Sequence, residues 1–110
     1  MAKFEVTQRV NGEFQFNLKA DNGKVILTSE GYKAKASAYN GVESVRKNAG
    51  DSERYDVMES KDGQCYFTLK AGNNEVIGVS EMYVNFDNAN EGIARVKELA
   101  PTAELDDMTV

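Results

Sequence analysis

The chain has 110 residues, of which 41% are hydrophobic and 28% are charged, and its formal net charge is −5. This length suits one compact domain with a single hydrophobic core. No stretch is apolar for long enough to form a signal peptide or a membrane span, so we expect a cytoplasmic protein without membrane association. The absence of histidine and the presence of a single cysteine exclude imidazole metal sites, histidine-dependent nucleophiles and an intrachain disulfide.

The first unit begins with Phe4-Glu5-Val6-Thr7, which alternates apolar and polar residues as does a strand that buries one face. Asn11-Gly12 favours a tight hairpin turn, because both residues tolerate positive φ angles. Residues 14–20 continue the alternation and predict a second strand, with its phenylalanine and leucine side chains inward. After another turn, the β-branched content of residues 25–29 predicts a third strand.

The apolar spacing then changes from two residues to about 3.6, which is typical of a helix. The small-residue face of this helix consists of Ala38, Gly41, Val42, Val45 and Ala49. A glycine inside a helix costs about 0.5–1 kcal/mol relative to alanine. Because Gly41 has a counterpart in Gly92, we expect a large side chain or the sheet to approach both too closely for a methyl group. Pro101 ends the second helix.

All of these segments occur twice with a constant offset of 51 residues, as repeat 1 (residues 3–50) and repeat 2 (residues 54–101). Each repeat alone is near the lower size limit for a closed core, so we expect both to fold together as a single domain, residues 1–110. Two copies favour a closed pair over an open solenoid. We therefore expect a monomer that contains an internal pseudo-dimer.

The predicted fold class is α+β: two tandem β-β-β-α units packed as one pseudo-two-fold symmetric domain, with the helices on an antiparallel sheet. The pattern leaves open whether the two three-stranded sets join edge to edge, exchange strands or face one another. Residues 102–110 lack periodicity and include Glu104, Asp106 and Asp107. We expect this segment to be a flexible acidic tail.

Residues 30–45, EGYKAKASAYNGVESV, together with residues 18–23, LKADNG, resemble the YegP-like (UPF0339) family of small bacterial tandem-repeat proteins of uncharacterised function. The resemblance covers both repeats and implies a fold of two tandem units, or of one unit that pairs as a homodimer. It implies no enzymatic activity and no site. The chain departs from the family at Ala34, where many relatives have a serine that could cap the first helix.

Carboxylates recur at Glu5/Asp56 and Glu30/Glu81, so an enzyme that uses carboxylates alone is formally conceivable, and we rank it last. The sequence lacks phosphate-binding glycine loops and EF-hand spacing. We therefore expect no enzyme, no catalytic residues, no cofactor and no metal. Cys65 aligns with the inward Phe14, and we expect a buried, inert thiol.

Polar residues that recur outside the turns are candidate binding residues, because they could rim two equivalent clefts, each closed partly by the other repeat. A competing structural interpretation is that the tyrosines pack on the helix and leave their hydroxyls in water. Two lysines at the first helix entrance join the candidates, because their counterparts, Val84 and Phe86, are unlike them. The candidate rim consists of Ser29, Glu30, Tyr32, Lys33, Lys35, Ser80, Glu81 and Tyr83. Lys19 and Lys70 lie on the outward sheet face, where they can pair with carboxylates.

The function that we favour is a non-catalytic interaction module for a protein or peptide partner. It would use an exposed strand edge or the outward sheet face of Gln15, Asn17 and Lys19. The alternative is binding of single-stranded nucleic acid by repeat 1, since residues 1–50 carry eight Lys/Arg against five Asp/Glu. Residues 51–110 carry five against thirteen, and this acidic half opposes attraction to phosphate.

Overall fold

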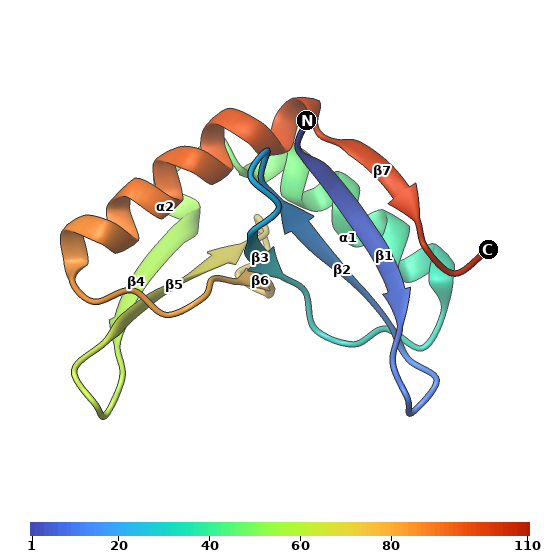
Figure 1. The fold of residues 1–110 in the computed structure, drawn as a ribbon, viewed down its shortest axis with the longest axis horizontal. Coiled ribbons are helices and arrows are strands. Elements are labelled where there is room, and N and C mark those ends of the chain that lie inside the picture. The colour runs from blue at the N-terminus through green and yellow to red at the C-terminus, as the bar shows by residue number, and fades with distance from the viewer.

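The computed structural model describes all of residues 1–110 and places both repeats in one seven-stranded sheet (Figure 1). Repeat 1 forms β1 (Lys3–Gln8), β2 (Phe14–Lys19), β3 (Val25–Thr28) and α1 (Lys35–Asn48). A short 3-10 turn, η1 (Ser52–Arg54), leads to β4 (Tyr55–Glu59), β5 (Cys65–Lys70), β6 (Val76–Val79) and α2 (Phe86–Leu99). A second 3-10 turn, η2 (Ala100–Thr102), connects α2 to β7 (Glu104–Asp107).

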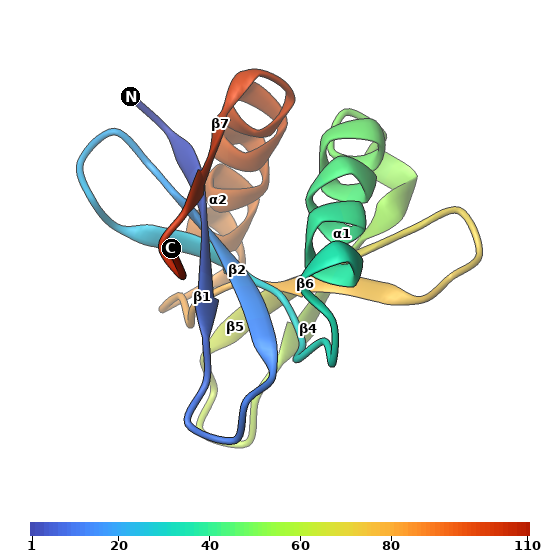
Figure 2. The ribbon, with the colours of Figure 1, turned by 90° about the vertical axis from the view of Figure 1, so that its right-hand side faces the viewer.

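The two repeats join edge to edge. The strand order is β4-β5-β6-β3-β2-β1-β7, and the pairing of Thr28 with Val79 links β3 to β6 at the seam. Neighbouring strands within each repeat are antiparallel, and both helices cover the same face of the sheet (Figure 2). The predicted fold class is therefore confirmed, and the arrangement that the sequence left open is resolved.

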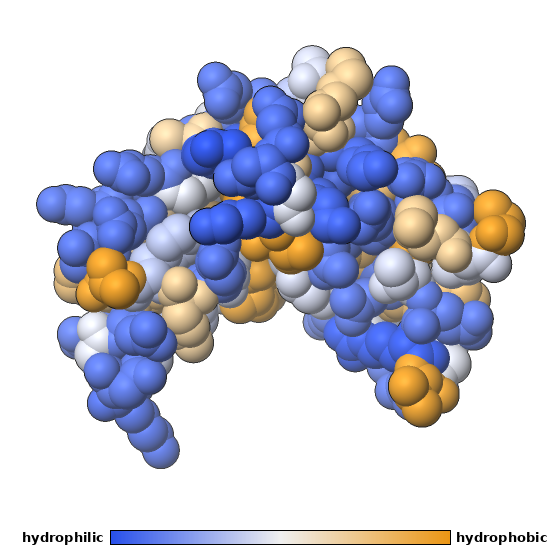
Figure 3. Space-filling view, viewed as in Figure 1, coloured by the Kyte–Doolittle hydropathy of each residue, from blue (hydrophilic) through white to orange (hydrophobic).

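The sheet is bent into an arch, with the helices on its outer side. The β1–β2 and β4–β5 hairpins descend from the arch as two legs (Figure 1). The surface beneath is hollowed between these legs and is mostly hydrophilic (Figure 3). Asn11-Gly12 and Asp62-Gly63 form the tips of the hairpins, where both glycines adopt positive φ. The positive φ angles explain why glycine recurs at both turns.

A single cluster of 18 buried residues draws on both repeats. Helix α1 contacts β5 and β6 of repeat 2, and α2 contacts β3 of repeat 1, so each helix crosses the seam. Near the seam, an added Cβ at Gly78 would lie 2.7 Å from Leu27 Cδ2, and Gly78 is the counterpart of Leu27. The pseudo-symmetry is broken at this position because two leucines would occupy the same space.

The helix glycines lie directly over aromatic rings, as the sequence predicts. A Cβ at Gly41 would lie 2.6 Å from the hydroxyl oxygen of Tyr32 and 2.8 Å from Cε2 of Phe16. At Gly92, a Cβ would collide with the hydroxyl of Tyr83. Both helices can approach the sheet only because these positions lack a side chain.

The helix starts differ as the departure at Ala34 suggests. No side chain caps α1 at Ala34, whereas Oδ1 of Asn85 accepts a hydrogen bond from the Asn88 N–H at the start of α2, at 2.8 Å. Side-chain capping typically contributes about 1 kcal/mol to helix stability. The start of α1 therefore depends on packing against the sheet and on Lys35, whose partner lies in β7.

The prediction of a flexible acidic tail is wrong for its central part. Residues Glu104–Asp107 form β7, which runs parallel to β1 from Lys3 to Val6 and makes the sheet mixed. Leu105 packs against the core, and the Met108 N–H donates to the Val6 carbonyl at 2.9 Å. The tail is ordered because it covers an edge strand whose apolar side chains would otherwise face water.

Candidate functional site

Ser29 and Ser80 have a structural role that sequence reasoning did not assign. The Ser29 hydroxyl accepts a hydrogen bond from the Phe16 N–H at 2.9 Å and donates to the Glu30 carbonyl at 2.8 Å. Ser80 makes the equivalent bonds with the Phe67 N–H and the Glu81 carbonyl, at 2.9 and 2.7 Å. Each hydroxyl thus replaces one missing backbone contact where the third strand of its repeat ends.

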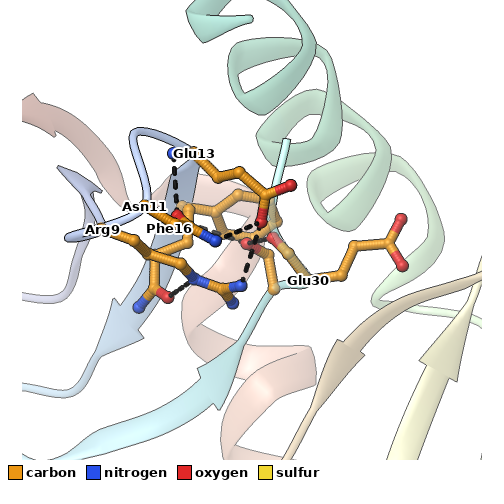
Figure 4. A network of polar contacts seen from close by, with 7 residues as sticks. Arg9, Asn11, Glu13, Phe16 and Glu30 are labelled. Atoms are coloured by element: carbon orange, nitrogen blue, oxygen red, sulfur yellow. Dashed lines mark hydrogen bonds and ion pairs between the residues drawn. The ribbon is translucent and has the colours of Figure 1, made fainter. Parts of the chain in front are cut away.

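Glu30 lies beside a polar network at the β1–β2 hairpin but does not join it. Arg9 Nε donates to Gln15 Oε1 at 2.6 Å, and Arg9 Nη1 lies 3.6 Å from Glu13 Oε1. This Glu13 oxygen also accepts a hydrogen bond from Asn11 Nδ2 at 3.2 Å. The Glu30 carboxylate points away from this network (Figure 4). Glu30 and Glu81 are both exposed.

Tyr32 and Tyr83 are packing residues. The Tyr32 ring stacks on Phe16 with centroids 6.3 Å apart, and Tyr83 stacks on Phe67 at 6.1 Å. Burial raises the pKa of both tyrosine hydroxyls above its usual value, and neighbouring glutamates add to the effect. The packed ring of the structural interpretation therefore describes both residues, but their hydroxyls lie against Gly41 and Gly92 rather than in open water.

Of the two equivalent inter-repeat clefts expected at these tyrosines, one is present, beside Tyr83, and Tyr32 lines no cavity. It has a volume of about 420 Å³, and its walls include Lys24 and Ile26 of repeat 1 as well as Glu81 and Arg95 of repeat 2. Its charged groups are of both signs and the cleft is open, so it selects no ligand class. A binding role for this rim stays a prediction.

The structure also brings candidate residues together at the seam between β3 and β6. Ser29, Glu30, Ser80 and Glu81 line one hollow there, of about 480 Å³. Its floor is apolar and includes valines of both third strands. Since both serine hydroxyls are already used in bonds to the backbone, the free polar groups at this hollow are the two glutamates and the Thr28 hydroxyl.

The outward lysines take part in ion pairs across the sheet. Lys19 Nζ lies 3.1 Å from Glu5, and Lys70 Nζ lies 2.5 Å from Asp56. The recurring pair Glu5/Asp56 is therefore committed to lysine partners. Lys33 is exposed, and it makes no ion pair.

The clearest asymmetry of the molecule lies at the two outer edges of the sheet. Strand β7 covers β1, whereas no strand lies beyond β4 (Figure 1). Beneath β7, the side chains of Phe4, Val6 and Val42 are 0% exposed. Their counterparts in repeat 2 are all partly exposed: Tyr55, Val57 and Ile93. The same repeat therefore has a covered edge in one copy and an open edge in the other.

The open edge is bordered by a groove of about 380 Å³ between β4 and α2, which we call the β4 groove. It is lined by Ser52, Tyr55, Val57, Asn90, Ile93, Ala94 and Lys97. The offset of 51 residues maps three of its four apolar lining residues, Tyr55, Val57 and Ile93, onto the side chains that lie beneath β7 in repeat 1. The β4 groove is therefore the counterpart of the space that β7 fills.

The backbone of β4 presents unpaired groups to this groove. Val57 pairs with Phe67 in the register of β4 and β5, but the N–H and C=O of Phe67 both bond to Ser80 on the other side. In an antiparallel ladder, such a residue makes no backbone bond to the residue opposite. The N–H and C=O of Val57 consequently point outward. In β1 the Val6 carbonyl occupies the equivalent position and accepts a bond from the Met108 N–H, directly after β7.

Side chains of α1 hold β7 in place. Asp107 Oδ2 accepts hydrogen bonds from the Tyr39 hydroxyl at 2.5 Å and from Lys35 Nζ at 3.1 Å, and Arg46 Nη2 donates to the Ala103 carbonyl at 2.6 Å. Hydrogen bonds from Thr109, Tyr39 and Lys35 hold the pKa of Asp107 well below its usual range. Lys35, expected at a binding rim, therefore binds the chain's own C-terminal strand.

Only part of this anchoring set recurs at the β4 groove. Lys97 is the counterpart of Arg46, and each cation lies over an aromatic ring of its own repeat. Arg46 Cζ lies 5.4 Å from the centroid of the Phe4 ring, and Lys97 Nζ lies 5.8 Å from that of Tyr55. Phe86 replaces Lys35. The sequence indicated that Lys35 and Phe86 differ, but it did not reveal the β4 groove, because the position of residues 102–110 was not predictable.

The fold and these edges define a class: a tandem β-β-β-α protein with one sheet edge covered by its own C-terminus and the equivalent edge open. The family described as "Domain of unknown function (DUF1508)" matches residues 10–56 and 60–107, and the chain belongs to it. The chain is 47% identical over 106 residues to a UPF0339 protein of Acinetobacter baylyi, covering 96% of each. It is 41% identical over 110 residues to the UPF0339 protein YegP of Yersinia pestis, covering 100% of this chain and 98% of the relative.

Two solved structures share the fold. The solution structure of the protein of unknown function yegP from E. coli has a TM-score of 0.92 and 41% identity, covering 97% of this chain and 92% of that chain. The UPF0339 protein SO3888 from Shewanella oneidensis has a TM-score of 0.91 and 41% identity, covering 97% and 91%. The resemblance noted from the sequence is confirmed. None of these names designates an enzyme, and no helix of the structure has the length and apolar character that a membrane span requires.

Proposed function

We propose that the protein is a non-catalytic interaction module that binds an extended segment of a partner protein at the open edge of β4. The bound segment would add an eighth strand to the seven-stranded sheet, as in other complexes formed by strand addition. The observation that carries this proposal is the comparison of the two edges. In repeat 1 the chain itself supplies an added strand, and in repeat 2 the corresponding backbone groups and the β4 groove are uncovered.

The energetics of such a complex follow from the same comparison. Exposed strand edges are usually protected by proline, bulges or covering segments, because their unpaired groups attract other strands. Strand β4 contains no proline. Its side chains that line the β4 groove, Tyr55 and Val57, are aromatic and aliphatic. Burying one leucine-sized side chain in the β4 groove would contribute about 1.5–3 kcal/mol, and the backbone bonds would fix the register.

The proposal is tested by selecting peptides from an unbiased library of extended segments and comparing two variants. Val57→Pro removes the outward N–H and is compatible with an edge strand. Val57→Thr keeps this N–H and the shape of the side chain, and so serves as the matched control. We expect selected peptides to bind Val57→Pro at least about tenfold more weakly than the wild-type protein, because roughly one backbone hydrogen bond and the local register are lost. Binding to Val57→Thr should be retained.

Both variants should first be compared with the wild-type protein by circular dichroism and amide spectra, so that only folded proteins enter the comparison. Equal binding to Val57→Pro and Val57→Thr would contradict the proposal. The same conclusion follows if the library yields no peptide whose binding perturbs the amide signals of Tyr55–Glu59.

A further inference from the structure

We infer that the segment accepted at the β4 edge runs parallel to β4 and carries apolar residues at two alternate positions. This inference rests on the proposed function and specifies its partner. The occupant is thus an extended segment of another protein with the pattern apolar-x-apolar, in which the middle residue faces away from the helices.

The direction follows from β7. That strand runs parallel to β1, and its entry is fixed by the bond from Arg46 to the Ala103 carbonyl. At the β4 groove Lys97 lies in the place of Arg46 and currently donates to the Ser52 hydroxyl. Lys97 can turn to a backbone carbonyl at the same end of the groove. A parallel segment therefore meets a cation where its first carbonyl arrives, as β7 does.

The first apolar position corresponds to Leu105. Leu105 pairs with Phe4 and packs against the core, and the counterpart of Phe4 is Tyr55. Around Tyr55 the groove walls are formed by Ile93 and Ala94. An apolar side chain at this position replaces water on these surfaces. A charged one would lose its hydration, and the cation nearby, Lys97, is taken by the first backbone carbonyl of the segment.

The second apolar position corresponds to Asp107, and here the two edges differ in chemistry. Asp107 is held in repeat 1 by Lys35 and Tyr39. Their counterparts are Phe86, which is 52% exposed, and Asn90. A carboxylate would find no cation there, while an apolar side chain would cover the exposed phenylalanine ring. At this position, therefore, the edge of β1 favours an acidic side chain, whereas the edge of β4 favours an apolar one.

The same difference argues against a second copy of the chain as the occupant. A β7 strand moved to the β4 groove of another copy would place Asp107 beside Phe86 and would lose both α1 partners. Its own edge offers those partners without any association. Strand β7 is thus matched to β1, and the open edge is left for a segment of different sequence.

The inference is tested with synthetic peptides that cover residues 101–109 of the chain, one with the native sequence and one with Asp107→Leu. We expect the Asp107→Leu peptide to bind the full-length protein at least about tenfold more tightly than the native peptide, and with shifts at Tyr55–Glu59 rather than at β1. A third peptide that combines Asp107→Leu with Leu105→Ser should lose this gain.

The groove can be converted to the chemistry of the other edge. In the double variant Phe86→Lys with Asn90→Tyr, the native peptide should become the tighter binder and the ranking should reverse. Both positions are exposed, so the fold should persist. If the double variant is unstable, the single substitution Phe86→Lys supports the same comparison and should reduce the preference for the Asp107→Leu peptide.

A nitroxide on the peptide N-terminus reports the direction of binding. A parallel complex broadens amide signals at Tyr55, and an antiparallel complex broadens those at Glu59. The inference is overturned if the two peptides bind equally, if the converted groove keeps the original ranking, or if the label broadens Glu59. In each of these cases, the proposed function still stands if peptides selected from the unbiased library bind at the β4 edge. It fails separately if no extended peptide binds there.

Discussion

At the scale of single residues, the most informative positions are those where the two repeats agree for a steric reason. Gly41 and Gly92 leave room for Tyr32 and Tyr83, whose rings are stacked on the buried phenylalanines of β2 and β5. Each glycine lowers helix propensity, so its recurrence reflects close packing between helix and sheet. The tyrosines recur for the same reason, and their presence in both repeats is not evidence of a binding site.

Gly41→Ala should therefore destabilise the protein by about 1–3 kcal/mol, despite the better helix propensity of alanine. The new methyl group would meet the Tyr32 hydroxyl and the Phe16 ring. Urea unfolding measures the change. In a Tyr32→Ala background the cost of Gly41→Ala should fall by at least half, because one of the two obstacles is gone and Phe16 can shift.

The matched control is Gly50→Ala, because no atom lies within 4 Å of a Cβ at Gly50. This control should change the free energy of unfolding by no more than about 0.5 kcal/mol. If Gly41→Ala is as harmless as Gly50→Ala, or if its cost is unchanged without the Tyr32 ring, the steric explanation for the helix glycines is wrong.

At the scale of secondary-structure elements, β7 separates what the sequence could predict from what it could not. The alternation in residues 14–20 and the helical spacing from Ala38 to Ala49 predicted elements that the structure contains. Strand β7 has a single apolar residue, the partly buried Leu105, among acidic ones, so no periodicity distinguishes it from a solvated tail. Its order depends on partners far along the chain, such as Tyr39 and Lys35. One signal was available: Phe4 and Val6 predict a strand that needs cover at an edge.

The anchoring of β7 by Asp107 predicts a pH dependence. An unfolded aspartate has a pKa of about 3.9, and hydrogen bonds lower the pKa of folded Asp107. Between these two pKa values the unfolded chain binds more protons at Asp107 than the folded chain does. The stabilisation of the fold by the Asp107 carboxylate is therefore present above about pH 4 and is lost as the pH falls further. Asp107→Asn should therefore lower stability at neutral pH and flatten the loss of stability on the acid side.

Urea unfolding between about pH 6 and pH 2.5 compares the wild-type protein with Asp107→Asn across this range. Asp106→Asn is the control, since its carboxylate is more exposed and makes only a 3.4 Å contact with Lys3. It should follow the wild-type curve closely. Parallel curves for Asp107→Asn and the wild-type protein would show that Asp107 contributes no pH-dependent stability.

At the scale of the whole molecule, the pseudo-two-fold arrangement makes every departure from symmetry informative. The duplication predicted that two half-molecules share one core, but it left open how their strands join. It could not show which departures matter, because that depends on distance from the axis and from the edges. Near the axis, Leu27 and Gly78 differ because their space is shared. At the edges, Lys35 and Phe86 differ because one repeat holds β7 and the other does not.

The shared space at the axis predicts a compensating exchange. Gly78→Leu should cost about 1–3 kcal/mol by overpacking, and Leu27→Gly should cost several kcal/mol through a cavity. The double variant, which exchanges the two residues, should recover at least half of the summed cost, because one leucine again fills the space from the other side. Urea unfolding of all four proteins tests this, and additive costs would contradict the shared packing.

The central claim is that the β4 edge is open in the protein alone and closed when an extended segment binds. The amide hydrogen exchange of Val57, with Val6 as its internal reference, measures this directly. The account predicts that the Val57 N–H exchanges much faster than that of Val6 in the free protein, and slows by at least about tenfold when a selected peptide is bound. If Val57 is already as protected as Val6 without a partner, or stays unprotected at saturating peptide, the claim is contradicted.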